Sequence, residues 1–266
     1  MAKPRVLVFS GYGLNCEAET KFAFETAGAI ADIVHINDII DGHKDLSDYQ
    51  IMAFPGGFSY GDDTGSGNAF ANKLRHHVWP KVLKFVSRDT LTIGVCNGFQ
   101  IIANLGLVPA IKGEYGQRQV ALLHNNNARY TVRWVDLRVQ NSSPWLTGIN
   151  YLTLPIAHGE GKVCADPAMR QLLEQNNLVA LRYISGEICR YQNLTANPNG
   201  ALDDIAGITD ESGRVLGLMP HPERALNFTQ LPHWPILKEQ YRRRNETIPE
   251  HGSGIAVFQN AVRYFK

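Results

Sequence analysis

Short apolar segments that alternate with helical segments are the feature that most constrains the fold of this chain. Val6–Phe9, Ile51–Phe54 and Leu91–Val95 are mostly apolar, and each is followed by a turn containing glycine. Helical spacing follows two of these turns, at Glu17–Ala27 and Asn97–Asn104. Strands that read as continuous apolar runs are buried on both faces, as strands of a parallel sheet are. The first half therefore predicts a parallel α/β sheet with helices on both faces.

The second half of the chain has a different pattern. Tyr130–Val139 alternates polar and apolar residues, which is typical of an antiparallel strand with one solvated face. Further strands of this half are expected at Tyr151–Ile156, Val179–Ile184, Ile205–Thr209 and Val215–Met219, and a last helix at Ile255–Phe265. In the first half, one more strand is expected at Ile30–Ile36. We therefore expect an antiparallel extension of the same sheet.

Prolines mark two interruptions in these patterns. Ala69–Ser87 has helical spacing, but Pro80 is expected to kink or divide that helix. Asn227–Gly254 contains three prolines and two glycines, and we expect an irregular surface excursion there. Its arginine run at Arg242–Arg244 is read as a solvated face. The remaining length fits one domain over residues 1–266.

Charge and cysteine content narrow the class of protein. The 26 basic and 25 acidic side chains leave a net charge of +1, which argues against a nucleic-acid partner and against a polybasic membrane anchor. No apolar run reaches transmembrane length. The four cysteines form no C-x-x-C pair, which excludes a zinc finger, and scattered thiols fit a reducing cytoplasm. We predict no metal site.

The segment Thr92–Gln100 carries the strongest chemical signal. An apolar strand runs into Gly94-Val95-Cys96-Asn97-Gly98 and then into a helix, which is the nucleophile-elbow pattern with sulfur in place of oxygen. Glycines permit the tight turn, and the positive end of the helix favours the thiolate form of Cys96. The backbone N–H of Asn97 can then bind an oxyanion. The alternative is a buried, inert cysteine, and we read Cys16 and the other two cysteines in that way.

A cysteine nucleophile needs a histidine base and a group that orients it. His221 follows the expected strand Val215–Met219, and Pro222 favours extended backbone at His221. Residues two apart in extended chain point to the same side, so Glu223 can lie beside the imidazole. We predict a triad of Cys96, His221 and Glu223.

Other polar candidates compete with this triad. His158 lies in the motif Ala157-His158-Gly159-Glu160-Gly161, and its position near the site stays open. The Asp62-Asp63 pair lacks a third metal ligand and reads as a loop cap. Most remaining histidines, at positions 35, 43, 124, 233 and 251, read as surface or loop residues.

Two glycines form a second candidate anion site. Gly56 and Gly57 follow the strand Ile51–Phe54, and their N–H groups can form a nest or the second half of an oxyanion hole; an ordinary tight turn is the alternative. The pair Gly11 and Gly13 lacks the third glycine of a dinucleotide fingerprint. The chain has no phosphate-binding G-x-x-x-x-G-K-[ST] loop, so we expect no nucleotide cofactor in this chain.

These motifs together resemble the class I (triad) glutamine amidotransferases, and more closely the glutaminase components of phosphoribosylformylglycinamidine synthases. The segments that carry the resemblance are PGGFSYGD at 55–62, GVCNGFQ at 94–100, AHGEG at 157–161, NPNG at 197–200, IAGI at 205–208 and MPHPER at 219–224. The resemblance implies a single flavodoxin-like α/β domain with a mostly parallel sheet and an antiparallel extension.

The resemblance also implies roles for the residues. Cys96 would attack the side-chain amide of L-glutamine, His221 would transfer protons and Glu223 would orient His221. Gly56, Gly57, Phe58, Asn97 and Gln100 would bind the substrate, with the N–H groups of Gly57 and Asn97 holding the oxyanion. Ammonia would pass to a large synthetase subunit that binds ATP and Mg, beside a small accessory subunit.

Two rival interpretations remain at this stage. A glutaminase that serves another synthetase, such as one making cytidine nucleotides, would share the triad and differ in partner. A free-standing cysteine hydrolase on the same scaffold usually lacks the His-Pro-Glu arrangement found at 221–223.

Overall fold

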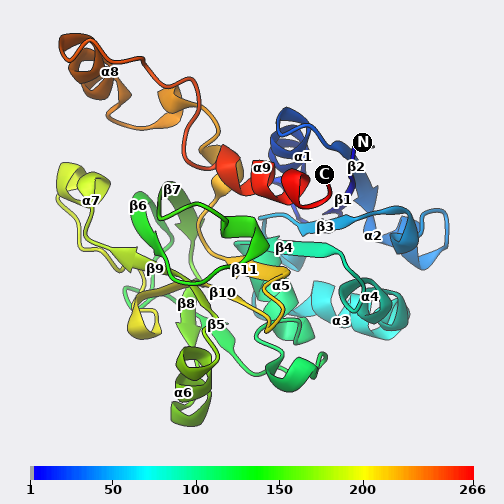
Figure 1. Ribbon diagram of the computed structural model, residues 1–266. Coiled ribbons are helices and arrows are strands. Elements are labelled where there is room, and N and C mark those ends of the chain that lie inside the picture. Colours follow the sequence, from blue (N-terminus) through cyan, green and yellow to red (C-terminus); the bar gives the residue numbers. More distant parts are fainter. Residues whose placement is uncertain (1–2) are drawn as a thin grey trace.

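The computed structural model describes residues 3–266 and contains a central mixed sheet of nine strands. The strand order is β2-β1-β3-β4-β11-β10-β9-β6-β7. The prediction of an α/β fold with a mostly parallel sheet and an antiparallel extension is confirmed (Figure 1). The prediction of one domain over 1–266 stays a prediction, and residues 1 and 2 lie outside the described part.

The parallel half supplies the frame. Its strands are β1 (Arg5–Ser10), β2 (Ile30–His35), β3 (Ile51–Phe54), β4 (Leu91–Val95) and β11 (Val215–Leu218). Their order, 2-1-3-4 followed by β11, is the flavodoxin-like order. In such sheets ligands bind beyond the carboxyl ends of the strands, so the loops that follow β1, β3, β4 and β11 are where a site is expected.

Antiparallel strands continue the sheet beyond β11. They are β10 (Ile205–Thr209), β9 (Val179–Ile184), β6 (Thr131–Val139) and β7 (Tyr151–His158). A separate pair joins β5 (Ala121–Leu123) to β8 (Lys162–Cys164). Four antiparallel pairings separate β11 from β7, so β7 runs in the same direction as the parallel strands. Its last residues, Ala157 and His158, therefore lie at the carboxyl edge, and Ala157 lines the cavity there.

Helices cover both faces of the parallel half. The helices are α1 (Glu17–Thr26), α2 (Ile36–Ile40), α3 (Asn68–His77), α4 (Trp79–Val86), α5 (Asn97–Leu105), α6 (Pro167–Gln175), α7 (Glu187–Gln192), α8 (Trp234–Arg243) and α9 (Ile255–Tyr264). Figure 1 shows α1 and α9 on one face and α3, α4 and α5 on the other. The expected division near Pro80 is confirmed, since α3 ends at His77 and α4 begins at Trp79. Among the described residues, no helix has the length and apolar character needed to cross a membrane.

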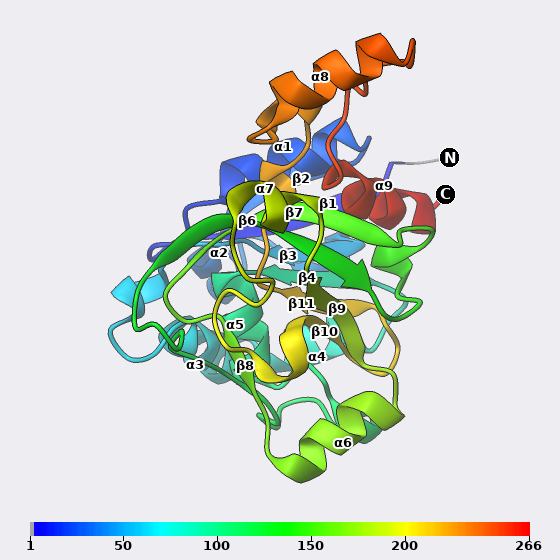
Figure 2. The same ribbon diagram turned by 90° about the vertical axis from the view of Figure 1, so that its left-hand side faces the viewer.

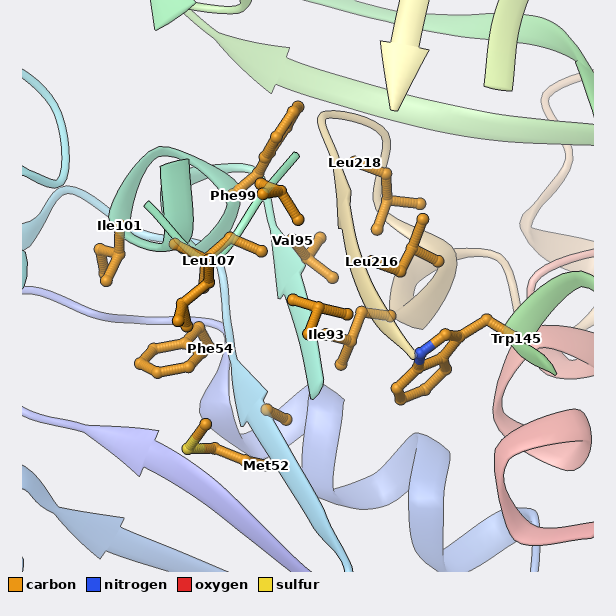
Figure 3. Close-up of a cluster of buried hydrophobic side chains, with 14 of the residues drawn as sticks. Met52, Phe54, Ile93, Val95, Phe99, Ile101, Leu107, Trp145, Leu216 and Leu218 are labelled. Carbon is orange, nitrogen blue, oxygen red and sulfur yellow. The ribbon is translucent and has the colours of Figure 1, made fainter. Parts of the chain in front are cut away.

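The core lies between the sheet and these helices. Ile93 on β4 and Leu216 on β11 are register partners and share one face of the sheet, whereas Met52 on β3 and Phe99 on α5 lie on the other face (Figure 3). All four side chains are fully buried. Each large aliphatic or aromatic side chain buried in this way contributes roughly 1.5–3 kcal/mol, so the strands that carry the site rest on a rigid base.

One expectation about the fold is wrong. Residues 227–254 were expected to be irregular, but they contain the ten-residue helix α8, which stands away from the body in both views (Figure 1 and Figure 2). The prolines that suggested irregular chain lie at its start and after its end. Pro235 occupies the first turn, where its missing N–H costs nothing. The exposure expected for Arg242–Arg244 is confirmed.

Candidate functional site

A cavity of about 80 Å³ opens at the carboxyl edge of the parallel strands. The loops after β1, β3, β4 and β11 line it, together with the end of β7 and a residue just before β6. Its lining residues are Asn15, Cys16, Gly57, Phe58, Cys96, Tyr130, Ala157, His221 and Arg224. The sequence separates these residues by up to about 200 positions, and the sheet topology brings them together.

Cys96 sits on the strained turn that the elbow pattern predicts. Its backbone has φ 53° and ψ −109°, which is an uncommon conformation for a residue other than glycine. The turn needs glycine at both sides: a Cβ on Gly98 would lie 1.8 Å from the carbonyl oxygen of Phe54, and one on Gly94 would lie 2.6 Å from that of Gly98. The geometry places Cys96 at the N-terminus of α5, with its Sγ 3.6 Å from the carbonyl oxygen of Ala157.

His221 and Glu223 form a buried pair beside this turn. Nδ1 of His221 lies 2.6 Å from Oε1 of Glu223, as the sequence spacing predicts. The His221 side chain is 3% exposed and the Glu223 side chain is fully buried. Both lie where β11 has ended, and the N–H of His221 donates to the carbonyl of Pro155 on β7. The imidazole is therefore held by Glu223, and the backbone of His221 is held by β7.

The surroundings favour a charged imidazole. Burial alone lowers the pKa of His221, but the negative charges of Glu223 and of the Cys96 thiolate outweigh it and hold the pKa well above its usual value. Nε2 of His221 has no hydrogen-bond partner within residues 3–266. Because Cys96 lines the same cavity, this nitrogen is available for proton exchange with the sulfur or with a bound substrate.

The two glycines after β3 lie against the site for different reasons. A Cβ on Gly56 would lie 2.7 Å from Cε1 of His221, and one on Gly57 would lie 2.5 Å from the carbonyl oxygen of Gly13. Gly57 and Leu14 form an antiparallel bridge whose two hydrogen bonds are donated by the N–H groups of Asn15 and Phe58. The N–H of Gly57 takes no part in this bridge. That group can serve as an oxyanion donor, as can the N–H of Asn97 in the first turn of α5.

The predicted substrate residues divide into two sets. Phe58 lines the cavity, is 41% exposed and packs near Tyr130, with ring centres 5.8 Å apart. Gln100 does not reach the cavity. It is buried and joins two loops, accepting from Asn97 Nδ2 and donating to the carbonyl of Glu160.

The Asn97 side chain also points away from the cavity. Its Oδ1 accepts from the N–H of Ser59, and its Nδ2 lies 3.3 Å from Asp62 Oδ1. Burial raises the pKa of Asp62 to about 6. The carboxyl group expected only to cap a loop therefore also contacts the residue after the nucleophile.

His158 lies near the site, which answers the question that the sequence left open. Its Nδ1 lies 3.1 Å from Oδ1 of Asn125. Burial, together with the charge of the neighbouring His221, lowers the pKa of His158 to about 3, so this ring is neutral near pH 7. His233, which was expected at the surface or in a loop, lies in the turn before α8. It is buried and stacks on Tyr191 of α7, with ring centres 4.9 Å apart.

Two further residues of the site, Cys16 and Arg224, were not predicted to belong to it. Both line the cavity, and Arg224 Nη2 lies 3.1 Å from Cys16 Sγ and 3.3 Å from Glu19 Oε1. Cys16, read as an inert thiol, is thus the second sulfur of the site. Cys16 follows a strand and precedes a helix, as Cys96 does, and this position could have indicated a site residue. No glycine follows Cys16 directly, so it was read as inert.

Comparisons with known proteins agree with this geometry. The model of the CobB/CobQ-like glutamine amidotransferase domain family matches residues 3–265. The chain belongs to this family. A relative from Methanococcus maripaludis, strain C5, named phosphoribosylformylglycinamidine synthase subunit PurQ, is 49% identical over 98% of each chain. A subunit of the same name from Dehalococcoides mccartyi is 41% identical over 99% of this chain and 98% of its own.

A solved structure supports the same relation. A chain in the structure of PurLQS from Thermotoga maritima matches over 100% of both chains, with a TM-score of 0.72 and 30% identity. The resemblance to glutamine amidotransferases drawn from the motifs is therefore confirmed, and the flavodoxin-like fold with it.

Proposed function

We propose that this chain is the glutaminase component of a phosphoribosylformylglycinamidine synthase, acting in de novo purine biosynthesis. The observation that carries the proposal is the 49% identity, over 98% of both chains, to a subunit of that name. The geometry supports it, because Cys96 and His221 line one cavity and Glu223 bonds the imidazole. The rival of a glutaminase for another synthetase has no comparable support.

Glutamine hydrolysis follows from the positions of these groups. The Cys96 thiolate attacks the side-chain amide carbon of L-glutamine, and the oxyanion lies between the N–H groups of Gly57 and Asn97. His221 donates its proton to the leaving nitrogen, which departs as ammonia and leaves a γ-glutamyl thioester. His221 then takes a proton from water, the hydroxide attacks the thioester, and glutamate leaves as the thiolate reforms.

The surrounding residues assist without reacting. The Glu223 carboxylate fixes the tautomer of His221 and stabilises the imidazolium. Phe58 and Tyr130 form part of the cavity wall. Asn97, Gln100 and Gly56 act chiefly by holding the loops and the imidazole in place.

The released ammonia goes to a partner. We propose that a large synthetase subunit binds ATP and Mg, amidates formylglycinamide ribonucleotide and works with a small accessory subunit. The name PurLQS, under which the matched structure is known, and the lack of a P-loop motif in this sequence support this division. We also propose that the chain works in the cytoplasm, since its four cysteines are unpaired.

The test is glutamine-dependent amidation of formylglycinamide ribonucleotide, with and without a matching synthetase subunit. We expect the wild-type chain with its partner to use glutamine, and the Cys96→Ala variant to support amidation only from added ammonia. We also expect low glutaminase activity for the chain alone. Two results together would overturn the purine assignment. The chain would fail to support glutamine-dependent amidation with a purine-pathway synthetase that is active on ammonia, and it would support such amidation with a synthetase of another pathway.

A further inference from the structure

Three ligand-type side chains meet beside the catalytic cavity. Cys16 from the loop after β1, and His221 and Glu223 from the segment after β11, place one sulfur, one ring nitrogen and one carboxylate oxygen within 4.8 Å of one another. All three residues are buried. The glutaminase mechanism uses His221 and Glu223 but gives no role to Cys16.

One of these side chains carries an unused ligand atom. Oε2 of Glu223 is buried and has no hydrogen-bond partner among residues 3–266. A buried polar atom without a partner costs about 1–3 kcal/mol. Glu223 therefore retains a carboxylate oxygen that a ligand can satisfy.

The donor set fits one class of ion. A thiolate, an imidazole and a carboxylate are the ligands that zinc accepts, whereas magnesium and calcium prefer oxygen alone. Cys16 and His221 also line the cavity of about 80 Å³, which leaves room for a water molecule as a fourth ligand. The charges at the site balance. The Cys16 thiolate and the carboxylates of Glu223 and Glu19 carry three negative charges, and a divalent cation with Arg224 carries three positive charges.

We propose that Cys16, His221 and Glu223 form a binding site for a thiophilic divalent cation such as Zn²⁺, and that the bound cation reversibly blocks glutamine hydrolysis. The inhibition rests on the proposed glutaminase function, but the binding does not. On binding, the Cys16 thiol and Nδ1 of the His221 imidazolium each release a proton to solvent, and the ion takes the sulfur as thiolate and the ring as neutral imidazole.

The bound cation blocks catalysis through the ring nitrogen that faces Glu223. Nδ1 of His221 lies 2.6 Å from Oε1 of Glu223, so this nitrogen, and not Nε2 on the far side of the ring, can share a cation with the carboxylate. A cation on Nδ1 displaces the bond to Glu223 and leaves the ring proton on Nε2, so that nitrogen can no longer act as a base. His221 then cannot serve Cys96.

The binding test uses the full chain with the nucleophile removed. We would titrate Co²⁺ into the Cys96→Ala variant and follow the thiolate-to-cobalt absorption band, then displace Co²⁺ with Zn²⁺. We expect the band in Cys96→Ala and its loss in Cys96→Ala with Cys16→Ser or Cys16→Ala. The matched control adds Cys164→Ser, which removes the one thiol that is not buried and should leave the band unchanged.

The inhibition test follows glutamate release by the complex in zinc-buffered solutions. Each variant is normalised to its own rate without metal, and a chelator should restore that rate. We expect the half-inhibiting concentration of free Zn²⁺ to rise at least about 10-fold in Cys16→Ser. Circular dichroism confirms that each variant is folded.

The outcomes separate the two claims. No cobalt band in Cys96→Ala, or a band that survives loss of Cys16, would overturn the site. A band without inhibition would overturn the block. If neither the wild type nor Cys16→Ser released glutamate, the proposed function would fail while the cobalt titration still decided the site.

Discussion

A methyl group added at Gly56 tests whether the imidazole must stay where the structure places it. The new Cβ would lie 2.7 Å from Cε1 and 3.4 Å from Nδ1 of His221, and 3.1 Å from Cys16 Sγ. The backbone of Gly56 is not left-handed, so alanine fits the chain itself. The strain of a Gly56→Ala substitution therefore falls on the ring and on the sulfur.

The size of the effect follows from these distances. Carbon atoms in contact lie at 3.5–4.0 Å, so the ring must retreat by roughly 0.8–1.3 Å. A misplacement of about 1 Å can cost about 100-fold in rate, which corresponds to about 2.7 kcal/mol. We expect kcat/KM to fall about 100-fold, chiefly through kcat, while overpacking lowers the free energy of unfolding by about 1–3 kcal/mol.

The assay compares glutamate release by Gly56→Ala and by Gly159→Ala in the complex with a synthetase. Gly159 is the matched control, because a Cβ there would meet only Tyr130 Cδ2, at 3.9 Å. Alkylation of Cys96 by iodoacetamide in the isolated chain reports on the thiolate–imidazolium pair without the partner. A folded Gly56→Ala variant with both rates within about 3-fold of the control would refute the idea that this contact positions His221.

Three further outcomes are expected. Glu223→Gln removes the charge that raises the pKa of His221, so that pKa should fall and kcat drop roughly 10²–10⁴-fold, measured as a pH–rate profile. His158 has a folded pKa of about 3, below the unfolded value of 6.5, so it contributes stability above pH 6.5 that is lost as pH falls towards 3. Between pH 7.5 and 4.5 the protonation of His158 should lower the free energy of unfolding, measured in urea, by about 3 kcal/mol. The His158→Gln variant should lack this contribution. Gly98→Ala should lower the free energy of unfolding by at least about 1–3 kcal/mol, because its Cβ would lie 1.8 Å from the Phe54 carbonyl oxygen.

The central strands could be predicted from the sequence to the residue. Ile51–Phe54, Leu91–Val95, Val179–Ile184 and Ile205–Thr209 are strands with the predicted bounds. Each is buried along its length or nearly so, and burial on both faces is what an apolar run between turn residues records. The triad geometry could be predicted where it depends on neighbours in the chain, as between His221 and Glu223.

The missed features depend on contacts that local sequence does not encode. Helix α8 has no buried residue. Trp234, Leu237 and Tyr241 recur at helical spacing, but the prolines around them predicted irregular chain instead. The helix is held in part by its Tyr241, which packs edge-on against Phe228 with ring centres 6.0 Å apart. Cys16 is 80 residues from Cys96, and it reaches the site because its N–H bonds the carbonyl of Gly56.

The positions of Asn97 and Gln100 show how the cavity stays small and yet keeps its donors. Both were predicted to bind substrate, yet their side chains bond the loops at Ser59 and Glu160. Such bonds fix two walls of the cavity to the first turn of α5, which also carries the strained Cys96. The two side chains then position the loops, while the backbone N–H of Asn97, in the first turn of α5, remains the group predicted to bind the oxyanion. One residue of the motif can therefore support the site through its side chain and keep its N–H as a donor.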